Sequence, residues 1–242
     1  MTLSELRLCY ITDRHGLASR PLLPVVAEAV EAGVDLLQIR EKDLATRDLL
    51  ALVEGALDAA RRAAVRGANS GIVVNDRLDV ALASGAHGVH LGGQSMPVQD
   101  VRAALAASGR PTFWVGVSCH SAAEVGAAED AGADYALLGP IFETASKLPY
   151  GPPLGLRPLE QATRKARIPV LALGGITLPR VRPCLQAGAA GVAGISIFQR
   201  CESLATCVAE LRREIEGFFG EGQEGAGPAS SATAIEGRAD ED

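Results

Sequence analysis

The stretch EAGVDLLQIR, residues 31–40, ends a helical pattern with Ala-Gly and then enters an apolar run. Three later stretches share this pattern, namely ASGAHGVHLG (83–92), DAGADYALLG (130–139) and QAGAAGVAGI (186–195). Each places a glycine where a helix ends, a position that favours glycine because a positive φ costs little without a Cβ. We therefore predict that four helices end at Gly33, Gly85, Gly132 and Gly188, and that each is followed by a strand.

Eight short apolar runs alternate with Ala-rich helical patterns along the chain. The runs cover residues 6–12, 36–40, 71–75, 88–91, 113–118, 135–139, 169–173 and 191–197. Most of them are continuously apolar, which is typical of parallel strands buried on both faces. Helical patterns lie between them, as at 46–66 and 122–131, so the chain repeats a strand–helix order. Eight such units in about 200 residues predict an α/β protein with a single (β/α)8 TIM barrel over residues 1–219.

The composition agrees with one large domain and argues against several other classes of protein. The chain has 242 residues, enough to bury a core without disulfides or metals, and its net charge of −6 argues against nucleic acid as a partner. The five cysteines form no C-x-x-C pair, so we expect reduced thiols in a cytoplasmic protein. No apolar run is long enough to cross a membrane, and the N-terminal residues lack the apolar core of a secretory signal.

The C-terminal residues have a different composition from the rest of the chain. The last helix is predicted at 203–219, and residues 220–242 are rich in Gly, Ala, Ser and Glu. Such a stretch buries too little apolar surface to offset its ordering entropy. We expect a disordered acidic tail over 220–242. The sequence leaves open whether the barrel forms a homo-oligomer.

The loops after the seventh and eighth runs predict a phosphate site. They contain Gly174-Gly175 and Gly194-Ile195-Ser196, where small residues expose backbone N–H groups at the start of the next helix. Barrel enzymes place their sites at this end of the strands, and the N-terminus of a helix offers unpaired donors to an anion. Phosphorylated small molecules are therefore the expected partners.

Other strand ends carry side chains that suit a second anionic group. Arg40, Lys42 and Lys147 can converge at the barrel mouth, where three cations suit a diphosphate or a carboxylate. Asp76 follows a predicted strand directly, and a carboxylate beside a diphosphate suits Mg²⁺. His120 also follows a strand, where it can act as a general acid or base or simply bond to a neighbouring backbone carbonyl.

Seven motifs in chain order resemble thiamine-phosphate synthase and its relatives, the TenI-type thiazole tautomerases. They are QIREK (38–42), VNDR (74–77), GVHLG (88–92), GVSCHS (116–121), GPIFETASK (139–147), ALGGI (172–176) and GISIF (194–198). The resemblance covers roughly residues 6–200. It implies a transferase of thiamine biosynthesis that condenses hydroxymethylpyrimidine diphosphate with thiazole phosphate (or its carboxylate), giving thiamine phosphate and diphosphate.

The resemblance also implies a role for each matching residue. The residues implied to bind the pyrimidine diphosphate are Gln38, Ile39, Arg40, Glu41, Lys42, Asn75, Ser118 and Lys147. Those implied to bind the thiazole phosphate are Thr144, Ala145, Ser146, Gly175, Ile195 and Ser196, with Gly174 as the adjacent alternative to Gly175. Arg40 and Lys147 would stabilise charge on the departing diphosphate, together with Mg²⁺ bound at Asp76.

One position departs from the synthase pattern, and another fits both the synthases and the tautomerases. Ser95 stands where the synthases have a second metal-binding Asp, so affinity for Mg²⁺ should fall unless Asp79 or Asp100 completes the site. His120 matches the proposed acid/base of the tautomerases, although many synthases also have a His there. The alternatives are therefore a TenI-type thiazole tautomerase that uses His120, and a non-catalytic regulator that binds thiazole phosphate or thiamine phosphate.

Overall fold

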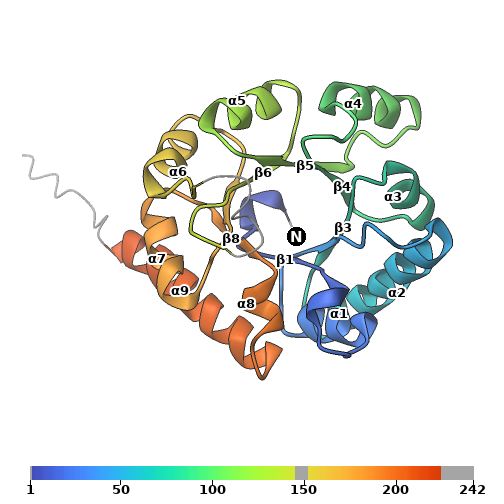
Figure 1. Cartoon of the computed structure of the whole chain (residues 1–242), viewed down its shortest axis with the longest axis horizontal. Coiled ribbons are helices and arrows are strands. Elements are labelled where there is room, and N and C mark those ends of the chain that lie inside the picture. The colour runs from blue at the N-terminus through green and yellow to red at the C-terminus, as the bar shows by residue number, and fades with distance from the viewer. Residues whose placement is uncertain (1, 145–151, 225–242) are drawn as a thin grey trace, which may run out of the picture.

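The computed structural model describes residues 2–144 and 152–224, which form a closed parallel barrel surrounded by helices (Figure 1). Each strand pairs with the next one along the chain, and the last strand closes the barrel on the first. The strands are β1 (Leu8–Ile11), β2 (Leu36–Ile39), β3 (Gly71–Asn75), β4 (Gly88–Leu91), β5 (Trp114–Cys119), β6 (Tyr135–Leu138), β7 (Val170–Leu173) and β8 (Gly191–Gly194). The predicted barrel is confirmed, and every predicted run contains a strand.

Helices follow the strands and cover the outside of the barrel (Figure 1). They are α1 (Leu22–Glu31), α2 (Thr46–Ala64), α3 (Leu78–Ser84), α4 (Val98–Ala107), α5 (Ala122–Asp130), α6 (Leu156–Thr163), α7 (Leu178–Gln186), α8 (Ser196–Gln199) and α9 (Leu204–Glu224), with the 3-10 helices η1 (Leu3–Glu5) and η2 (Arg14–Gly16). Gly33, Gly85, Gly132 and Gly188 lie just after helices and have φ angles between 74° and 96°. The four predicted helix ends are confirmed.

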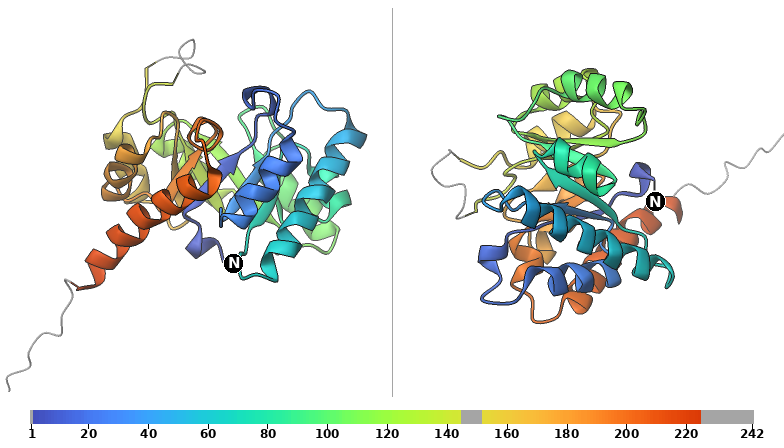
Figure 2. Two further views of the ribbon diagram at one scale, coloured as in Figure 1. Left: turned by 90° about the horizontal axis from the view of Figure 1, so that it is seen from below. Right: turned by 90° about the vertical axis from the view of Figure 1, so that its right-hand side faces the viewer.

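The strands are buried on both faces, as their continuous apolar sequences predict. Residues such as Leu37 and Val89 face the helices, while alternate residues point into the barrel. The interior cluster consists of Leu6, Cys9, Ile11, Leu36, Val73, Tyr135, Leu137, Leu171 and Ala193. Because side chains alternate along a strand, the last inward-facing residue of each strand reaches the mouth of the barrel. Figure 2 shows the loops that form this mouth at one end and η1 at the other.

The last helix is longer than its sequence predicts. The predicted helix ends at 219, whereas α9 continues to Glu224. Glu221 accepts hydrogen bonds of 2.9 and 3.0 Å from the guanidinium of Arg182 on α7, and this ion pair holds the last turns of α9 in place. The first residues expected in a tail are therefore helical, and 225–242 lie outside the described residues.

Two further observations concern expectations from the sequence. All five cysteines are free thiols, as predicted for reduced cysteines. Burial raises the pKa of Cys119 and of Cys184 to about 12, so both stay protonated and unreactive. Within residues 2–144 and 152–224, no helix has the length and apolar character needed to cross a membrane.

Candidate active site

The mouth of the barrel has a polar half and an apolar half. Inward-facing residues near the ends of β2 to β5 are polar, namely Gln38, Asn75, His90 and Ser118. The corresponding residues at the ends of β1, β7 and β8 are Ile11, Leu173 and Ile195, which pack on the interior cluster. One side of the mouth therefore suits a polar or charged ligand, and the other suits an apolar ring.

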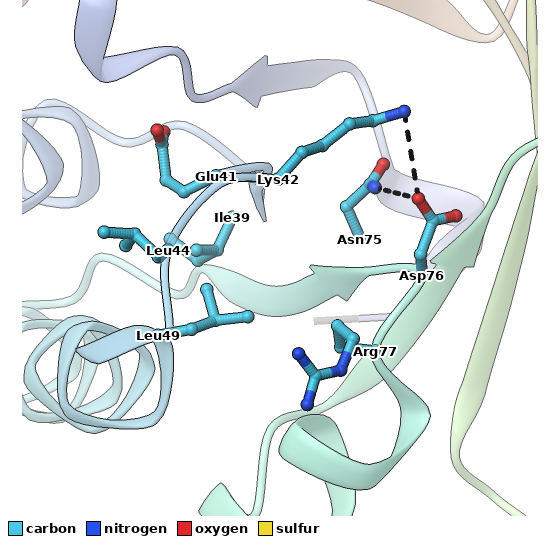
Figure 3. Close-up of a pocket in the computed structure, with 8 residues that line it drawn as sticks. All are labelled: Ile39, Glu41, Lys42, Leu44, Leu49, Asn75, Asp76 and Arg77. Atoms are coloured by element: carbon cyan, nitrogen blue, oxygen red, sulfur yellow. Dashed lines mark hydrogen bonds and ion pairs between the residues drawn. The ribbon is translucent and has the colours of Figure 1, made fainter. Parts of the chain in front are cut away.

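Three side chains of the polar half form a hydrogen-bonded chain with a fixed direction. Asn75 Nδ2 donates to Asp76 Oδ2 at 2.6 Å (Figure 3). Gln38 Nε2 in turn donates to Asn75 Oδ1 at 2.8 Å. Because a carboxylate only accepts, Asp76 sets the orientation of the Asn75 amide, which in turn sets that of Gln38. The remaining oxygen, Gln38 Oε1, is buried and has no hydrogen-bond partner among the described residues. An unpaired buried acceptor costs about 1–3 kcal/mol, so it indicates where a donor of a ligand would bind.

Asp76 is the carboxylate at the centre of this half. It has a left-handed backbone, with φ of 61°, a conformation uncommon outside glycine that is often found at functional sites. Its Oδ1 accepts hydrogen bonds from the Gly92 N–H at 3.3 Å and from the Ser95 hydroxyl. The Lys42 ammonium lies 4.0 Å from Oδ2 (Figure 3). The charge of Asp76 is thus met mainly by neutral donors.

The donor set around Asp76 fits a hard cation that also binds a substrate. Within the described part of the chain, no three His, Cys, Asp or Glu side chains gather to hold a metal ion. Asp79 pairs with Arg77 instead, and Asp100 lies on α4 with an exposed side chain. Mg²⁺ is commonly held by one or two carboxylates together with substrate phosphates. Asp76 with the Ser95 oxygen fits such a site, with low affinity before a phosphate binds.

Two cations follow β2, and a buried acid between them fixes their backbone. Arg40 and Lys42 come just after the carboxyl end of β2. The Glu41 carboxylate is buried and points away from Asp76 (Figure 3). Glu41 accepts hydrogen bonds from the Thr12 hydroxyl at 2.6 Å and from the Arg14 N–H at 3.2 Å. The same Thr12 oxygen accepts the Arg40 N–H at 2.9 Å. Glu41, implied by the resemblance to bind the diphosphate, therefore ties the loop after β1 to the segment that carries the cations.

A cavity of about 230 Å³ lies beside Asp76 at the edge of the mouth (Figure 3). Its lining residues are Ile39, Glu41, Lys42, Leu44, Leu49, Asn75, Asp76 and Arg77. Ile39 faces the helices rather than the interior, so it borders this cavity and not the centre of the barrel. The cavity extends the polar half toward α2.

A buried histidine that the sequence left without a role lies beneath Ser118. His90 is fully buried, its Nε2 lies 2.8 Å from Ser118 Oγ, and its Nδ1 lies 3.1 Å from Tyr135 Oη. Burial lowers the pKa of His90 to about 3, with the Asp76 charge opposing this and the Arg40 charge adding to it. Burial also raises the pKa of Tyr135 well above its ordinary value. Both groups are therefore neutral at neutral pH.

His120 lies at the exposed edge of the mouth and bonds to the backbone. Its ring Nδ1 lies 2.5 Å from the carbonyl oxygen of Gly139, and its backbone N–H donates to the Glu124 carboxylate at 2.7 Å. Because a carbonyl only accepts, Nδ1 is the donor of this hydrogen bond. This bond matches the second of the two roles that the sequence allows for His120, and acid/base chemistry at Nε2 stays a prediction.

The loops after β6 and β7 pack against each other, with Gly175 at their contact. Gly175 has a φ of 63°, and a Cβ there would lie 2.5 Å from the Glu143 carbonyl oxygen. Arg180 donates to the Gly175 carbonyl oxygen at 2.6 Å and stacks over the Phe142 ring at 4.7 Å. Only glycine allows this approach, which brings the two loops together at the mouth.

The remaining predicted phosphate residues lie at two places. Ile195 follows β8 directly and caps α8, which begins at Ser196, where the first backbone N–H groups of a helix lack intrahelical partners. Thr144 ends the described part of the loop after β6. Ala145, Ser146 and Lys147 lie outside the described residues. The predicted residues that are described all belong to the carboxyl ends of strands or to the loops that follow them.

Comparison with known proteins identifies relatives over most of the chain. Residues 8–198 match the family described as thiamine monophosphate synthase. A putative thiamine-phosphate synthase of Geobacter sulfurreducens is 46% identical over 192 residues, which are 79% of this chain and 86% of that protein. A thiamine-phosphate synthase of Albidiferax ferrireducens is 40% identical over 210 residues, which are 87% and 91% of the two chains. A solved thiamine phosphate pyrophosphorylase from Pyrococcus furiosus has a TM-score of 0.77 and 32% identity, covering 89% of this chain and 98% of its own.

Proposed function

The chain belongs to the thiamine monophosphate synthase family, and we propose that its barrel mouth joins hydroxymethylpyrimidine diphosphate to thiazole phosphate, releasing diphosphate. As a member of this family it is an enzyme, a transferase of thiamine biosynthesis. The observation that carries the proposal is the buried, unpaired Gln38 Oε1, whose amide is linked through Asn75 to Asp76. A tautomerase or a thiazole-phosphate-binding regulator has no need for this polar half.

The pyrimidine would occupy the polar half of the mouth. Gln38 Oε1 can only accept a hydrogen bond, and the exocyclic amino group of the aminopyrimidine can only donate one. Asn75 holds the Gln38 amide in the orientation that presents this oxygen. A hydrogen bond between the two groups removes the free-energy cost of leaving Gln38 Oε1 unpaired. The site therefore recognises the amino group as a hydrogen-bond donor as well as by its shape.

The diphosphate would bind between the cations after β2 and Asp76. Arg40 and Lys42 supply positive charge, and the matched motif adds Lys147 and Ser118 as further contacts. Asp76 and Ser95, with diphosphate oxygens, would hold Mg²⁺, which supplies electrostatic stabilisation of the charge on the leaving group. Glu41 contributes through the backbone that it holds, because its own carboxylate is bound to Thr12 and Arg14.

The thiazole phosphate would bind across the loops after β6, β7 and β8. Backbone N–H groups near Gly175, Ile195 and Ser196 suit its phosphate, and the same motif implies contacts from Thr144, Ala145 and Ser146. The apolar half, which Ile11 and Leu173 help to form, suits the thiazole ring. Each substrate thus has its own side of one mouth.

The reaction needs positioning and charge stabilisation more than proton transfer. The bond between the pyrimidine methylene carbon and the diphosphate oxygen breaks, and the diphosphate keeps the electron pair. The thiazole nitrogen then donates its lone pair to that carbon. Arg40 and Lys42 stabilise the negative charge that develops on the diphosphate. Loss of the diphosphate leaves a positive charge on the pyrimidine and its methylene carbon. The apolar half excludes water, which would otherwise react with this cation in place of the thiazole nitrogen.

An assay with both substrates and Mg²⁺ tests the proposal directly. The purified chain should form thiamine phosphate and diphosphate in equal amounts. Lys42→Ala should lower kcat/KM by about tenfold or more, because it removes one charge near the diphosphate. Lys165→Ala is the matched control, since Lys165 follows α6 at the opposite end of the barrel, and should leave the rate unchanged. Absence of product at high enzyme concentration would contradict the proposal.

A further inference from the structure

Tyr135, His90 and Ser118 form one hydrogen-bonded relay that crosses the barrel interior and ends at the mouth. His90 on β4 and Tyr135 on β6 are both paired in register with Gly116 on β5, the strand between them. A Cβ on Gly116 would lie 2.0 Å from Tyr135 Cζ and 2.3 Å from its Oη. The absence of a side chain at Gly116 therefore lets the Tyr135 ring lie across β5 and reach His90.

The burial of Tyr135 sets the direction of these hydrogen bonds. His90 Nδ1 is the one hydrogen-bond partner that the described residues give the Tyr135 hydroxyl. If Nδ1 carried a proton, the buried phenol proton would have no acceptor, which costs about 1–3 kcal/mol. Tyr135 therefore donates to Nδ1, and the neutral imidazole carries its proton on Nε2.

The direction set by Tyr135 passes on to Ser118. His90 Nε2–H donates to Ser118 Oγ over the 2.8 Å separation, so the serine oxygen acts as the acceptor in this pair. The serine proton then cannot return to His90 and is free to point into the mouth. Because Nδ1 accepts the Tyr135 proton and only Nε2 carries one, the imidazole is neutral, and the relay transmits an orientation and neither a charge nor a proton.

We propose that Tyr135 and His90 are positioning residues that hold the Ser118 hydroxyl as a hydrogen-bond donor to an anionic oxygen of the diphosphate substrate. This rests on the proposed function, which supplies the diphosphate. A donor that is already aligned needs no reorientation when the anion binds or gains charge, so its full interaction is available to the reaction. Ser118 makes the contact with the diphosphate, and Tyr135 and His90 act on the diphosphate only through Ser118.

The histidine tautomer tests the proposal without substrate or activity. The full chain is labelled with ¹⁵N-histidine, and long-range ¹H–¹⁵N correlation spectra report which ring nitrogen carries the proton. His90 should be the Nε2–H tautomer in the wild-type chain, and Tyr135→Phe should shift its signals. A neutral Nδ1–H tautomer in the wild-type chain would overturn the proposal.

Tyr10→Phe is the matched control for this measurement. Tyr10 is also buried and its hydroxyl accepts a hydrogen bond from Gln199 at 3.2 Å, so the variant loses the same atom at another place. It should leave the His90 signals unchanged. A shift as large as that in Tyr135→Phe would mean that the spectrum reports general packing, which would overturn the assignment.

Binding of inorganic diphosphate, measured calorimetrically with Mg²⁺ present, tests the connection to Ser118. Tyr135→Phe should weaken binding by about three- to tenfold, and Ser118→Ala by a similar factor. Because the relay acts through Ser118, adding Tyr135→Phe to Ser118→Ala should cause no further loss. Ser118→Thr keeps the hydroxyl and should stay sensitive to Tyr135→Phe.

The possible outcomes separate the relay from the proposed function. Additive effects of Tyr135→Phe and Ser118→Ala would overturn the relay and leave the diphosphate site intact. A wild-type chain that fails to bind diphosphate would overturn the proposed function and the ligand assigned to Ser118. If Tyr135→Phe does not fold, the tautomer in the wild-type chain still decides whether the direction of the relay is correct.

Discussion

Asp76 receives three hydrogen bonds from neutral groups. Because these donors carry no net positive charge, the site keeps a negative charge that a cation can meet. The donors are the Asn75 amide, the Gly92 N–H and the Ser95 hydroxyl. The same carboxylate also orients Gln38 through Asn75. One residue thus determines both how a metal would be held and which atom the pyrimidine of the proposed substrate would meet.

The hydroxyl at position 95 predicts weak metal binding by the free chain. Ser95→Asp should raise the affinity for Mg²⁺ or Mn²⁺ by about tenfold or more, because the number of charged ligands largely sets the affinity of such a site. Direct titration with Mn²⁺ by electron paramagnetic resonance, without substrate, measures this. Ser95→Asn is the control of similar size without charge. Equal affinity in the two variants would show that residue 95 does not face the metal.

Single residues also show what the sequence could and could not predict. The motifs led to Gln38, Asn75, Asp76 and Ser118, and these four do lie together at the mouth. The direction of their hydrogen bonds was not predictable, because it depends on which amide atom meets a carboxylate in three dimensions. Tyr135 was missed because its contact with His90 passes over another strand. A signal was present in the sequence, since both residues occupy inward-facing positions of their strands.

At the scale of elements, the seam between β8 and β1 leaves no room for a side chain at Gly191. A Cβ on Gly191 would lie 2.0 Å from the Arg7 carbonyl oxygen, which accepts the Val192 N–H at 2.8 Å. Strand pairing holds both the backbone of Gly191 and the Arg7 carbonyl, so neither can move aside. Gly191 therefore allows the barrel to close, a requirement that its sequence context alone did not reveal.

Gly191→Ala should destabilise the chain by about 1–3 kcal/mol or more, because it overpacks a seam that cannot relax. Gly126→Ala is the matched control, since its Cβ on α5 would meet no atom within 4 Å. That variant should stabilise the chain by about 0.5–1 kcal/mol through helix propensity. Urea unfolding monitored by circular dichroism gives both values. The expectation fails if the two variants change stability in the same direction.

The ends of the elements show where local patterns become ambiguous. Glycine predicted four helix ends correctly because its backbone preference is local. The eighth apolar run was predicted over 191–197, but β8 stops at Gly194 and α8 begins at Ser196. A short apolar run fits a buried strand and a buried helical turn equally well, so hydrophobicity could not divide it.

For the whole molecule, burial of a neutral histidine links stability to pH. The pKa of His90 is lowered to about 3, chiefly by desolvation, from an ordinary value of 6.5. Between these values the unfolded chain binds a proton that the folded chain does not, so unfolding becomes more favourable as the pH falls. The contribution is fully present above pH 6.5 and is lost as the pH falls toward 3.

His90→Asn should therefore change how stability depends on pH. The wild-type chain should be more stable than the variant at neutral pH, and the difference should shrink by about 2 kcal/mol between about pH 7 and about pH 5. Urea unfolding of both chains at a series of pH values measures this difference. Parallel curves over that range would contradict the assignment of a strongly lowered pKa to His90.

The pairing of β8 with β1 also constrains the order of events during folding. β1 lies near the start of the chain, and its second neighbour comes from residues 191–194. A chain still being synthesised therefore carries an unpaired strand edge on β1 until β8 has left the ribosome. Contacts between residues so far apart in sequence form slowly, and exposed strand edges promote aggregation. Expression yield should thus depend on synthesis rate and chaperone supply, and joining the ends of the chain while opening it elsewhere would shift that vulnerability to a different strand.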